Sequence, residues 1–147
     1  MRILVDTNVL VRSVERNHPL MRISRDALRR LHGDRNELCI TPQVIGEFWN
    51  VCTRPIPVNG LGHDIAAADR LVSRIETLFT LLPDSLDTFR RWRALIVQYE
   101  VKGAKVHDAR LVASAAAYDV ASILTFNVAD FKRYTSIAIL DPALLPS

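Results

Sequence analysis

Four acidic residues in this chain have the type and placement that metal-assisted hydrolysis requires. Asp6 follows directly after the mostly aliphatic run of residues 1–5. Glu47 and Asp130 come shortly after two further predicted strands, and Asp108 opens a predicted helix. Magnesium and manganese prefer oxygen ligands, usually one or two carboxylates together with waters and substrate phosphate. We therefore expect the four side chains to gather in one pocket, where a bound ion would activate water against a phosphodiester.

Each acid also has an ordinary structural explanation. Asp6 could cap the end of a strand, and Asp108 could interact favourably with a helix N-terminus. Asp130 could be a helix cap or a surface residue, and His107 beside Asp108 is more often a structural cap than a base. Glu47 could be a solvated helix residue, although its aromatic neighbours predict a largely buried segment. The metal-site hypothesis therefore depends on the four acids sharing one place in the fold.

The elements that must position these acids follow from the hydrophobic pattern. We predict five strands, at residues 2–6, 37–41, 77–82, 122–126 and 137–140. We predict helices near residues 8–15, 20–33, 42–52, 63–76, 86–99, 108–118 and 128–134, with a Pro- and Gly-rich loop at 53–62. Strands alternating with helices predict an α/β fold of three layers, α/β/α, with a central, mostly parallel sheet of about five strands. Right-handed crossovers would bring the carboxyl ends of these strands to one edge, where such sheets bind ligands.

Length and composition indicate one domain, residues 1–147. No apolar run reaches the ~18 residues of a membrane span, and the N-terminus does not read as a signal peptide. The two cysteines, Cys39 and Cys52, lie in apolar surroundings and match no zinc spacing. We expect them to be buried free thiols, and we expect the protein to be cytoplasmic and not associated with a membrane.

The charge of the chain is basic, with a net charge of +3 and a pI of about 9.2. Of the 19 basic residues, only Lys102, Lys105 and Lys132 are lysines. The arginine guanidinium can donate two parallel hydrogen bonds to phosphate oxygens. A basic surface around an acidic pocket therefore suits a polyanion such as RNA. A plain solvated basic surface is the alternative. The candidates for phosphate contact are Arg12, Arg54, Lys102, Lys105 and Arg110.

Four segments together resemble a known family. They are Asp6-Thr7-Asn8 after the first strand, Glu47 in the helix after the second, His107-Asp108-Ala109 opening a later helix, and Thr125-Phe126-Asn127-Val128-Ala129-Asp130-Phe131 after a strand. In this order they resemble the PIN domain, and more closely the toxin ribonucleases of VapBC toxin–antitoxin pairs. The resemblance covers nearly the whole chain and implies a PIN-like fold.

The resemblance also implies an activity and its residues. It implies a magnesium- or manganese-dependent endoribonuclease that has a small antitoxin partner and forms a homodimer. Asp6 and Asp108 would be the main metal ligands, and Glu47 would complete the site directly or through water. The residues that would orient the acids are Thr7, Asn8, Thr125 and Asn127.

One position departs from the family pattern. Many relatives carry Asp where this chain has Asn127, so the outer acidic role would fall to Asp130 or be weakened. The number of metal ions, one or two, therefore stays open. The presence of Asn127 also leaves open the alternative that the protein is a non-catalytic PIN module that binds RNA or protein.

Two other classes fit less well. A phosphatase resembling the haloacid dehalogenases would use Asp6 as nucleophile and Thr125 as its hydroxyl residue. Such enzymes need a second Asp where this chain has Asn8, and usually a cap domain for which 147 residues leave little room. A dinucleotide-binding domain would need a Gly-x-Gly-x-x-Gly motif after the first strand, which is not present.

Overall fold

A single parallel sheet forms the centre of the molecule. The computed structural model describes residues 1–145, and its five strands follow the order β3-β2-β1-β4-β5. All the neighbouring strands pair in parallel, so the sheet is wholly parallel where the sequence predicted a mostly parallel one. The strands are β1 (Arg2–Val5), β2 (Glu37–Ile40), β3 (Thr80–Leu81), β4 (Ser122–Leu124) and β5 (Ala138–Leu140).

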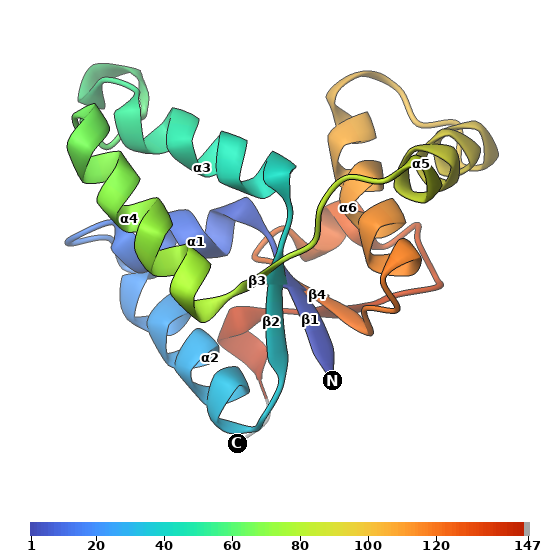
Figure 1. Cartoon of the computed structure of the whole chain (residues 1–147), viewed down its shortest axis with the longest axis horizontal. Helices are drawn as coiled ribbons and strands as arrows, with labels where there is room; N and C mark the ends of the chain where they lie inside the picture. The colour runs from blue at the N-terminus through green and yellow to red at the C-terminus, as the bar shows by residue number, and fades with distance from the viewer. Residues whose placement is uncertain (146–147) are drawn as a thin grey trace.

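Helices cover both faces of the sheet. The α-helices of the described residues are α1 (Thr7–Val14), α2 (Met21–Gly33), α3 (Pro42–Thr53), α4 (Ile65–Leu78), α5 (Leu86–Gln98) and α6 (Val106–Ala117). Short 3₁₀ helices are η1 (Ile56–Val58), η2 (Gly103–Lys105), η3 (Val128–Phe131) and η4 (Pro142–Leu144). Figure 1 shows α1 to α4 on one side of the sheet and α5 and α6 on the other. The predicted three-layer α/β/α architecture is confirmed.

β1 is the central strand, and its position explains its sequence. Ile3, Leu4 and Val5 are at most 3% exposed, because helices cover both faces of a parallel sheet. β1 pairs with β2 on one side and with β4 on the other. From β1 the chain first adds β2 and β3 on one side of the sheet and then returns to add β4 and β5 on the other. Open α/β sheets bind ligands at the carboxyl ends of the strands where the strand order reverses in this way. Asp6 follows β1 at this point.

Side chains just before α3 and α4 determine where these helices begin. Thr41 Oγ1 accepts a hydrogen bond from the Val44 N–H at 3.2 Å, and Pro42 occupies the first turn of α3, so this helix begins at residue 42 as predicted. Asp64 caps α4 through the Ala67 N–H at 2.8 Å, so this helix begins at Ile65 and not at residue 63. Local side-chain chemistry thus determines where these helices begin.

Several predicted boundaries were wrong. The strand predicted at 77–82 is only Thr80–Leu81, because α4 continues to Leu78 and β3 is an exposed edge strand. The strand predicted at 122–126 ends at Leu124, and the helix predicted near 128–134 is the 3₁₀ helix η3. These differences shorten the elements but leave their order unchanged.

The loop after α3 depends on one glycine. A Cβ atom at Gly60 would lie 1.7 Å from the carbonyl oxygen of Arg54, so no other residue fits there without moving the backbone. The Arg54 guanidinium donates to the Asn59 carbonyl at 3.2 Å within the same loop. The loop predicted at 53–62 therefore folds closely around Arg54.

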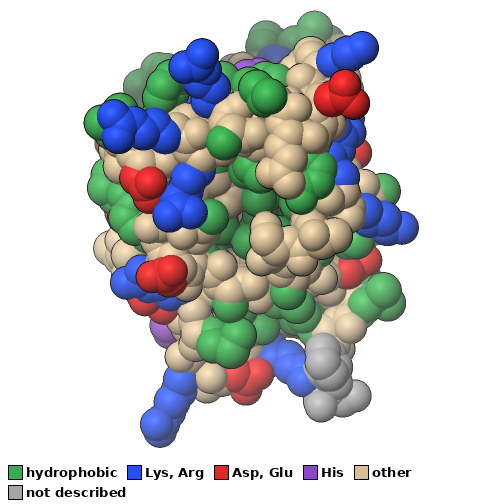
Figure 2. Space-filling view, turned by 90° about the vertical axis from the view of Figure 1, so that its right-hand side faces the viewer, with side chains coloured by type: hydrophobic (Ala, Val, Ile, Leu, Met, Phe, Trp, Pro, Cys, Tyr) green, Lys and Arg blue, Asp and Glu red, His purple; other side chains and the backbone are tan. Residues whose placement is uncertain are grey.

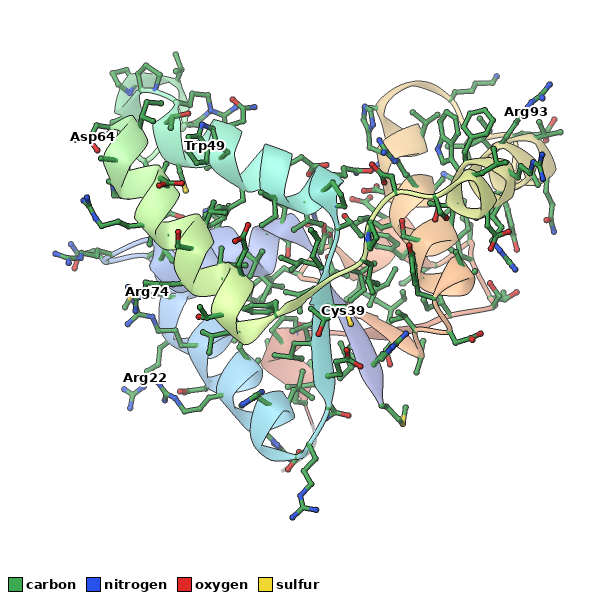
Figure 3. The ribbon with its side chains drawn as sticks, viewed as in Figure 1. Arg22, Cys39, Trp49, Asp64, Arg74 and Arg93 are labelled. Carbon is green, nitrogen blue, oxygen red and sulfur yellow. The ribbon has the colours of Figure 1, made fainter. Side chains whose placement is uncertain are left out.

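The cysteines match their prediction as buried free thiols. Cys39 lies on β2 within the sheet (Figure 3), and Cys52 lies on α3. Burial raises the pKa of each thiol to about 11. Within residues 1–145, none of the helices has the length and apolar character needed to cross a membrane.

Candidate active site

Asp6 is a buried carboxylate, 7% exposed, at the carboxyl end of β1. Its Oδ1 accepts a hydrogen bond from the Thr7 N–H at 2.8 Å. Its Oδ2 accepts hydrogen bonds from Asn8 Nδ2 at 3.1 Å and from Thr125 Oγ1 at 2.9 Å. Three donors therefore hold the carboxylate in one orientation and offset part of the cost of its burial.

Thr125 is oriented by the groups around it. Its hydroxyl oxygen accepts from Asn8 Nδ2 at 3.1 Å and from the Asn127 N–H at 3.0 Å, so its own proton is directed at Asp6. The side-chain oxygen of Asn8 accepts from the Phe126 N–H at 3.1 Å. α1 and the segment after β4 are thus joined through Asp6. Asn127 contributes its backbone N–H, while the residue as a whole is exposed.

Glu47 faces the same edge from α3. Its Oε2 accepts from Thr7 Oγ1 at 3.0 Å, and its Oε1 accepts from Gln43 Nε2 at 2.8 Å. The same Gln43 nitrogen donates to the His107 carbonyl at 3.0 Å, which joins α3 to the start of α6. Glu47 is exposed, unlike the buried segment predicted from its neighbours, because Phe48 takes the core-facing position of the helix.

The two remaining acids come from the other side of the sheet. Asp108 lies in the first turn of α6 and is partly buried. Asp130 lies in η3 and accepts a hydrogen bond from Lys105 Nζ at 2.7 Å. Asp130 is therefore paired with a cation, whereas Asp6 and Glu47 are held by neutral donors.

The electrostatics connect the four acids. Burial raises the pKa of Asp6 to about 6, and the charges of Asp108 and Glu47 add to this rise against the hydrogen bonds of Thr125 and Thr7. Burial also raises the pKa of Asp108, with further contributions from the charges of Asp130 and Glu47 and an opposing one from Lys105. The structure thus brings the four predicted acids into one electrostatic group.

The acid group fits a divalent cation only in part. Within residues 1–145, no three acidic, histidine or cysteine side chains are close enough together to surround one ion. Magnesium, however, is commonly held by one or two carboxylates plus waters and substrate phosphates. Oxygen donors whose negative charges repel one another suit such an ion, because its charge would relieve the repulsion. Asp6 and Asp108, with Glu47 nearby, therefore fit an ion that keeps several waters.

The family follows from a sequence comparison. The model of the PIN domain family matches residues 3–136 of this chain. The chain belongs to the PIN domain family. A comparison with curated protein sequences gives no match.

Solved structures share the fold of this PIN domain. VapBC2 from Rickettsia felis, bound to a DNA fragment from its promoter, superposes with a TM-score of 0.70 at 16% identity, covering 96% of this chain and 98% of that one. FitAB bound to a DNA fragment gives 0.71 at 16% identity, covering 99% and 98%. VapC20 from Mycobacterium tuberculosis, a toxin that cleaves the sarcin-ricin loop, gives 0.70 at 18% identity, covering 98% and 99%. At these identities the likeness establishes the shared fold.

The predicted phosphate contacts come from several separate elements of the fold. Arg12 pairs with Glu15, Lys105 pairs with Asp130, and Arg110 Nη2 lies 2.8 Å from Asp84 Oδ2. Arg54 donates within its own loop, and Lys102 is exposed next to η2. Most of these side chains therefore already have a partner that a phosphate would have to displace or share.

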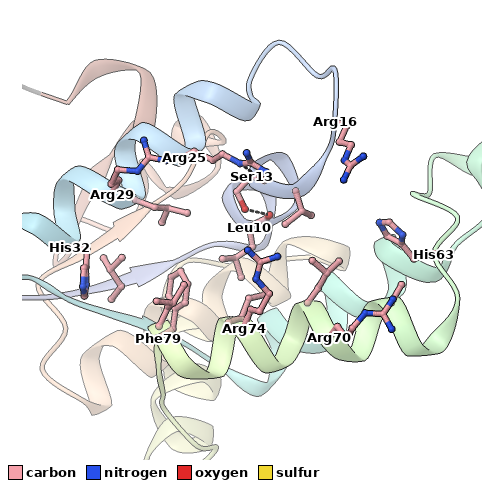
Figure 4. A pocket seen from close by; sticks show the side chains of 17 residues that line it. Leu10, Ser13, Arg16, Arg25, Arg29, His32, His63, Arg70, Arg74 and Phe79 are labelled. Atoms are coloured by element: carbon pink, nitrogen blue, oxygen red, sulfur yellow. Dashed lines mark hydrogen bonds between the residues drawn. The ribbon is translucent and has the colours of Figure 1, made fainter.

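A basic groove on the other side of α1 was missed in the sequence. It is a cavity of about 710 Å³ between α1, α2 and α4, with an apolar floor that includes Leu10, Leu71 and Phe79. Figure 4 shows arginines of α2 on one side of it and arginines of α4 on the other. Its lining includes no acid, and the basic residues are Arg16, Arg25, Arg29, Arg70, Arg74, His32 and His63.

Gln43 was also missed. It lies one helical turn before Glu47, so the spacing of four residues on α3 places both side chains on one face. That spacing was a signal available in the sequence. Its contact with His107 was not, because this contact depends on how closely α3 approaches α6.

Proposed function

We propose that this PIN domain is a metal-dependent endoribonuclease, the toxin of a type II toxin–antitoxin pair. It hydrolyses RNA phosphodiester bonds with a metal-activated water and leaves a 5′-phosphate and a 3′-hydroxyl. The observation that carries the proposal is the buried Asp6 carboxylate, fixed by Thr7, Asn8 and Thr125 at the strand-order reversal and electrostatically linked to Asp108 and Glu47. VapC20, which has the same fold, is a sarcin-ricin loop cleaving toxin, and this supports RNA as the substrate class.

The residues have distinct roles in this proposal. Asp6 and Asp108 would hold a magnesium or manganese ion, with Glu47 bound directly or through water. The ion, when bound, lowers the pKa of a coordinated water and stabilises charge on the phosphate. Thr125 and Asn8 keep the Asp6 oxygens aimed in one direction, which reduces the reorganisation that the reaction requires.

The supporting groups complete the site. Gln43 and Thr7 hold the two oxygens of Glu47, and Lys105 holds Asp130, the outer acid. Asn127 supports the position of Thr125 through its backbone. The phosphate contacts proposed for the RNA strand are Arg12, Arg54, Lys102, Lys105 and Arg110.

Cleavage of total bacterial RNA tests the reaction type. Purified protein is incubated with magnesium, with manganese and with EDTA, and the ends of the products are mapped. Discrete cuts that need the metal and carry 5′-phosphates are expected. Cuts that persist in EDTA, or that leave a cyclic phosphate, would contradict hydrolysis by a metal-activated water. Metal binding measured by calorimetry without any cleavage would favour the non-catalytic RNA- or protein-binding module.

The groove between α1, α2 and α4 is our proposed docking surface for the antitoxin. The similar structures include VapBC and FitAB complexes, in which a toxin is bound to its antitoxin, and this supports such a partner. An apolar floor with a rim of arginines suits an amphipathic segment that carries acidic residues on its polar face. We also carry over a homodimer from the family resemblance. Sedimentation as a monomer at micromolar concentration would contradict it.

A further inference from the structure

A second cavity lies beside the acid group, on the α5 and α6 side of the sheet. It has a volume of about 420 Å³, which lies within the usual range for small-molecule pockets. We call it the base pocket and define it by five of its lining residues: Asp84, Phe89, Trp92, His107 and Arg110. Figure 2 shows the α5 and α6 side of the molecule, where hydrophobic, basic and acidic side chains are all exposed.

Two aromatic rings form one wall of the base pocket. The ring centroids of Phe89 and Trp92 are 6.1 Å apart and the rings are inclined by 43°. Trp92 Nε1 donates to the Val106 carbonyl at 2.8 Å, which fixes the indole in place. Phe89 is 52% exposed although it is a large apolar side chain. A rigid indole beside an exposed phenyl ring offers flat apolar surface on which an unpaired base can stack.

The polar wall of the base pocket carries both donors and acceptors. Arg110 Nη2 lies 2.8 Å from Asp84 Oδ2, and both side chains remain about half exposed, at 40% and 47%. The guanidinium has further N–H donors and the carboxylate has further lone pairs beyond this one contact. Guanine presents adjacent N–H donors beside a carbonyl acceptor, which matches a carboxylate next to a guanidinium. Uracil has no such pair of adjacent donors.

The base pocket and the acid group share a wall. His107 lines the pocket and directly precedes Asp108 on α6. The His107 carbonyl accepts from Gln43 Nε2, which also donates to Glu47 at 2.8 Å. A nucleotide whose phosphate reaches the acids would therefore have its own base, or that of a neighbouring nucleotide, beside this pocket.

We propose that the base pocket binds one unpaired nucleobase of the RNA strand, with guanine preferred, next to the phosphate that is cleaved. The proposal rests on the ribonuclease function for the presence of RNA, but nucleotide binding can be measured without cleavage. Phe89 and Trp92 stack on the base, and Asp84 accepts from the N–H donors of its edge. Arg110 donates to the carbonyl of the same edge, and its other N–H donors can serve the phosphate contact proposed above. The pocket thus determines sequence preference on one side of the cut.

Fluorescence titration tests the proposal directly. The chain has two tryptophans, and Trp49 lies on α3, so Trp49→Phe leaves Trp92 as the single indole reporter. The four nucleoside 5′-monophosphates are titrated in EDTA, with ribose 5-phosphate as the probe that lacks a base. Quenching of Trp92 is expected with all four nucleotides, strongest with guanosine 5′-monophosphate, and not with ribose 5-phosphate.

Variants separate stacking from edge reading. Phe89→Leu keeps an apolar side chain but removes the ring, and should weaken binding of every nucleotide roughly tenfold. Asp84→Asn should weaken guanosine 5′-monophosphate selectively and leave uridine 5′-monophosphate unchanged. Val97→Ala is the matched control, because Val97 is exposed on the same helix and does not line the pocket. It should bind as wild type.

Three results would overturn the proposal. The first is equal quenching by ribose 5-phosphate, which would mean a phosphate site. The second is no quenching by any nucleotide. The third is unchanged nucleotide affinity in Phe89→Leu, and a change in the sedimentation of that variant would then mean that a second copy of the chain covers the pocket. Failure to cleave RNA while guanosine 5′-monophosphate still binds would contradict the ribonuclease function alone.

Discussion

The acid group, at the carboxyl ends of the strands, and the basic groove lie on two sides of the same short helix, α1. Thr7 and Asn8 at its start bind the acids, while Leu10 and Ser13, one turn later, line the groove. Asp6 is buried and held in place by three neighbouring donors, whereas the arginines of the groove, such as Arg74, are exposed. The first region is pre-arranged for chemistry, and the second is available for a partner.

The comparison also has a functional consequence. α1 is only eight residues long and its first turn supplies the donors that fix Asp6 and Glu47. A partner that fills the groove would contact the opposite end of the same helix. The two regions are therefore close enough for a bound partner to influence the acids, although each can be altered separately by mutation.

The largest expected effect concerns the cost of holding Asp6 ionised. The pKa of Asp6 in the folded protein, about 6, lies above the ordinary aspartate pKa of 3.8. Its contribution to stability is therefore fully present below about pH 4 and is lost as pH rises through about 6. That difference corresponds to about 3 kcal/mol. Urea unfolding in EDTA should show that wild type loses more stability than Asp6→Asn over this range. If the free energies of unfolding of wild type and Asp6→Asn depended on pH in the same way, burial would not raise the pKa of Asp6.

The next effect tests the orientation of Asp6. Thr125→Val removes the hydroxyl that donates to Asp6 at 2.9 Å, while Thr125→Ser retains it. Loss of a hydrogen bond that orients a metal-binding carboxylate typically costs 10- to 100-fold in activity or metal affinity. Single-turnover cleavage of a defined RNA should show a loss of this size for the valine variant only. Similar losses in both variants would indicate a packing defect instead.

The third prediction concerns the basic groove, where substitutions should change partner binding without changing RNA cleavage at the acid group. Reversing two charges in Arg70→Glu/Arg74→Glu should weaken binding of a designed acidic amphipathic helical peptide about tenfold or more, without lowering RNA cleavage. Fluorescence anisotropy with the labelled peptide measures this. The matched control is Arg22→Glu/Arg93→Glu, since both arginines are exposed (Figure 3) and neither lines the groove. Equal weakening in the two double variants would mean that only overall charge matters.

The smallest effect concerns Gln43. Gln43→Leu removes the contacts to Glu47 and to the His107 carbonyl, and should slow cleavage about three- to tenfold, the equivalent of one ordinary hydrogen bond. The melting temperature should change little, because Glu47 is exposed. A loss as large as that expected for Thr125→Val would mean that Gln43 contacts the reacting groups itself.

The sequence predicted the fold and the acid group because both depend on strand ends. Asp6 and Thr125 each follow a strand of a parallel sheet, and the rule that carboxyl ends share one edge is enough to bring them together. Glu47 and Asp108 could be placed near that edge by the order of the elements, although only the structure gives their partners.

The parts that were missed depend on side chains from separate helices. The groove combines residues from α1, α2 and α4, whose spacing in the sequence carries no common pattern. The pairing of Lys105 with Asp130 depends on how η2 meets η3, so Lys105 could be predicted only as a free basic residue. β3 was predicted too long because the mostly apolar run of residues 78–82 is divided between the end of α4, the two-residue strand and the segment after it.

The most direct test of the account is the rate at which a defined RNA is cleaved by wild type, Asp6→Asn and Asp69→Asn, with manganese and with EDTA. Asp69 is an exposed acid on α4, so its variant makes the same chemical change away from the acid group. The account predicts metal-dependent cleavage by wild type and Asp69→Asn and none by Asp6→Asn, with all three proteins folded by circular dichroism. Cleavage by Asp6→Asn at the wild-type rate would contradict the central claim that the Asp6 site is the nuclease centre.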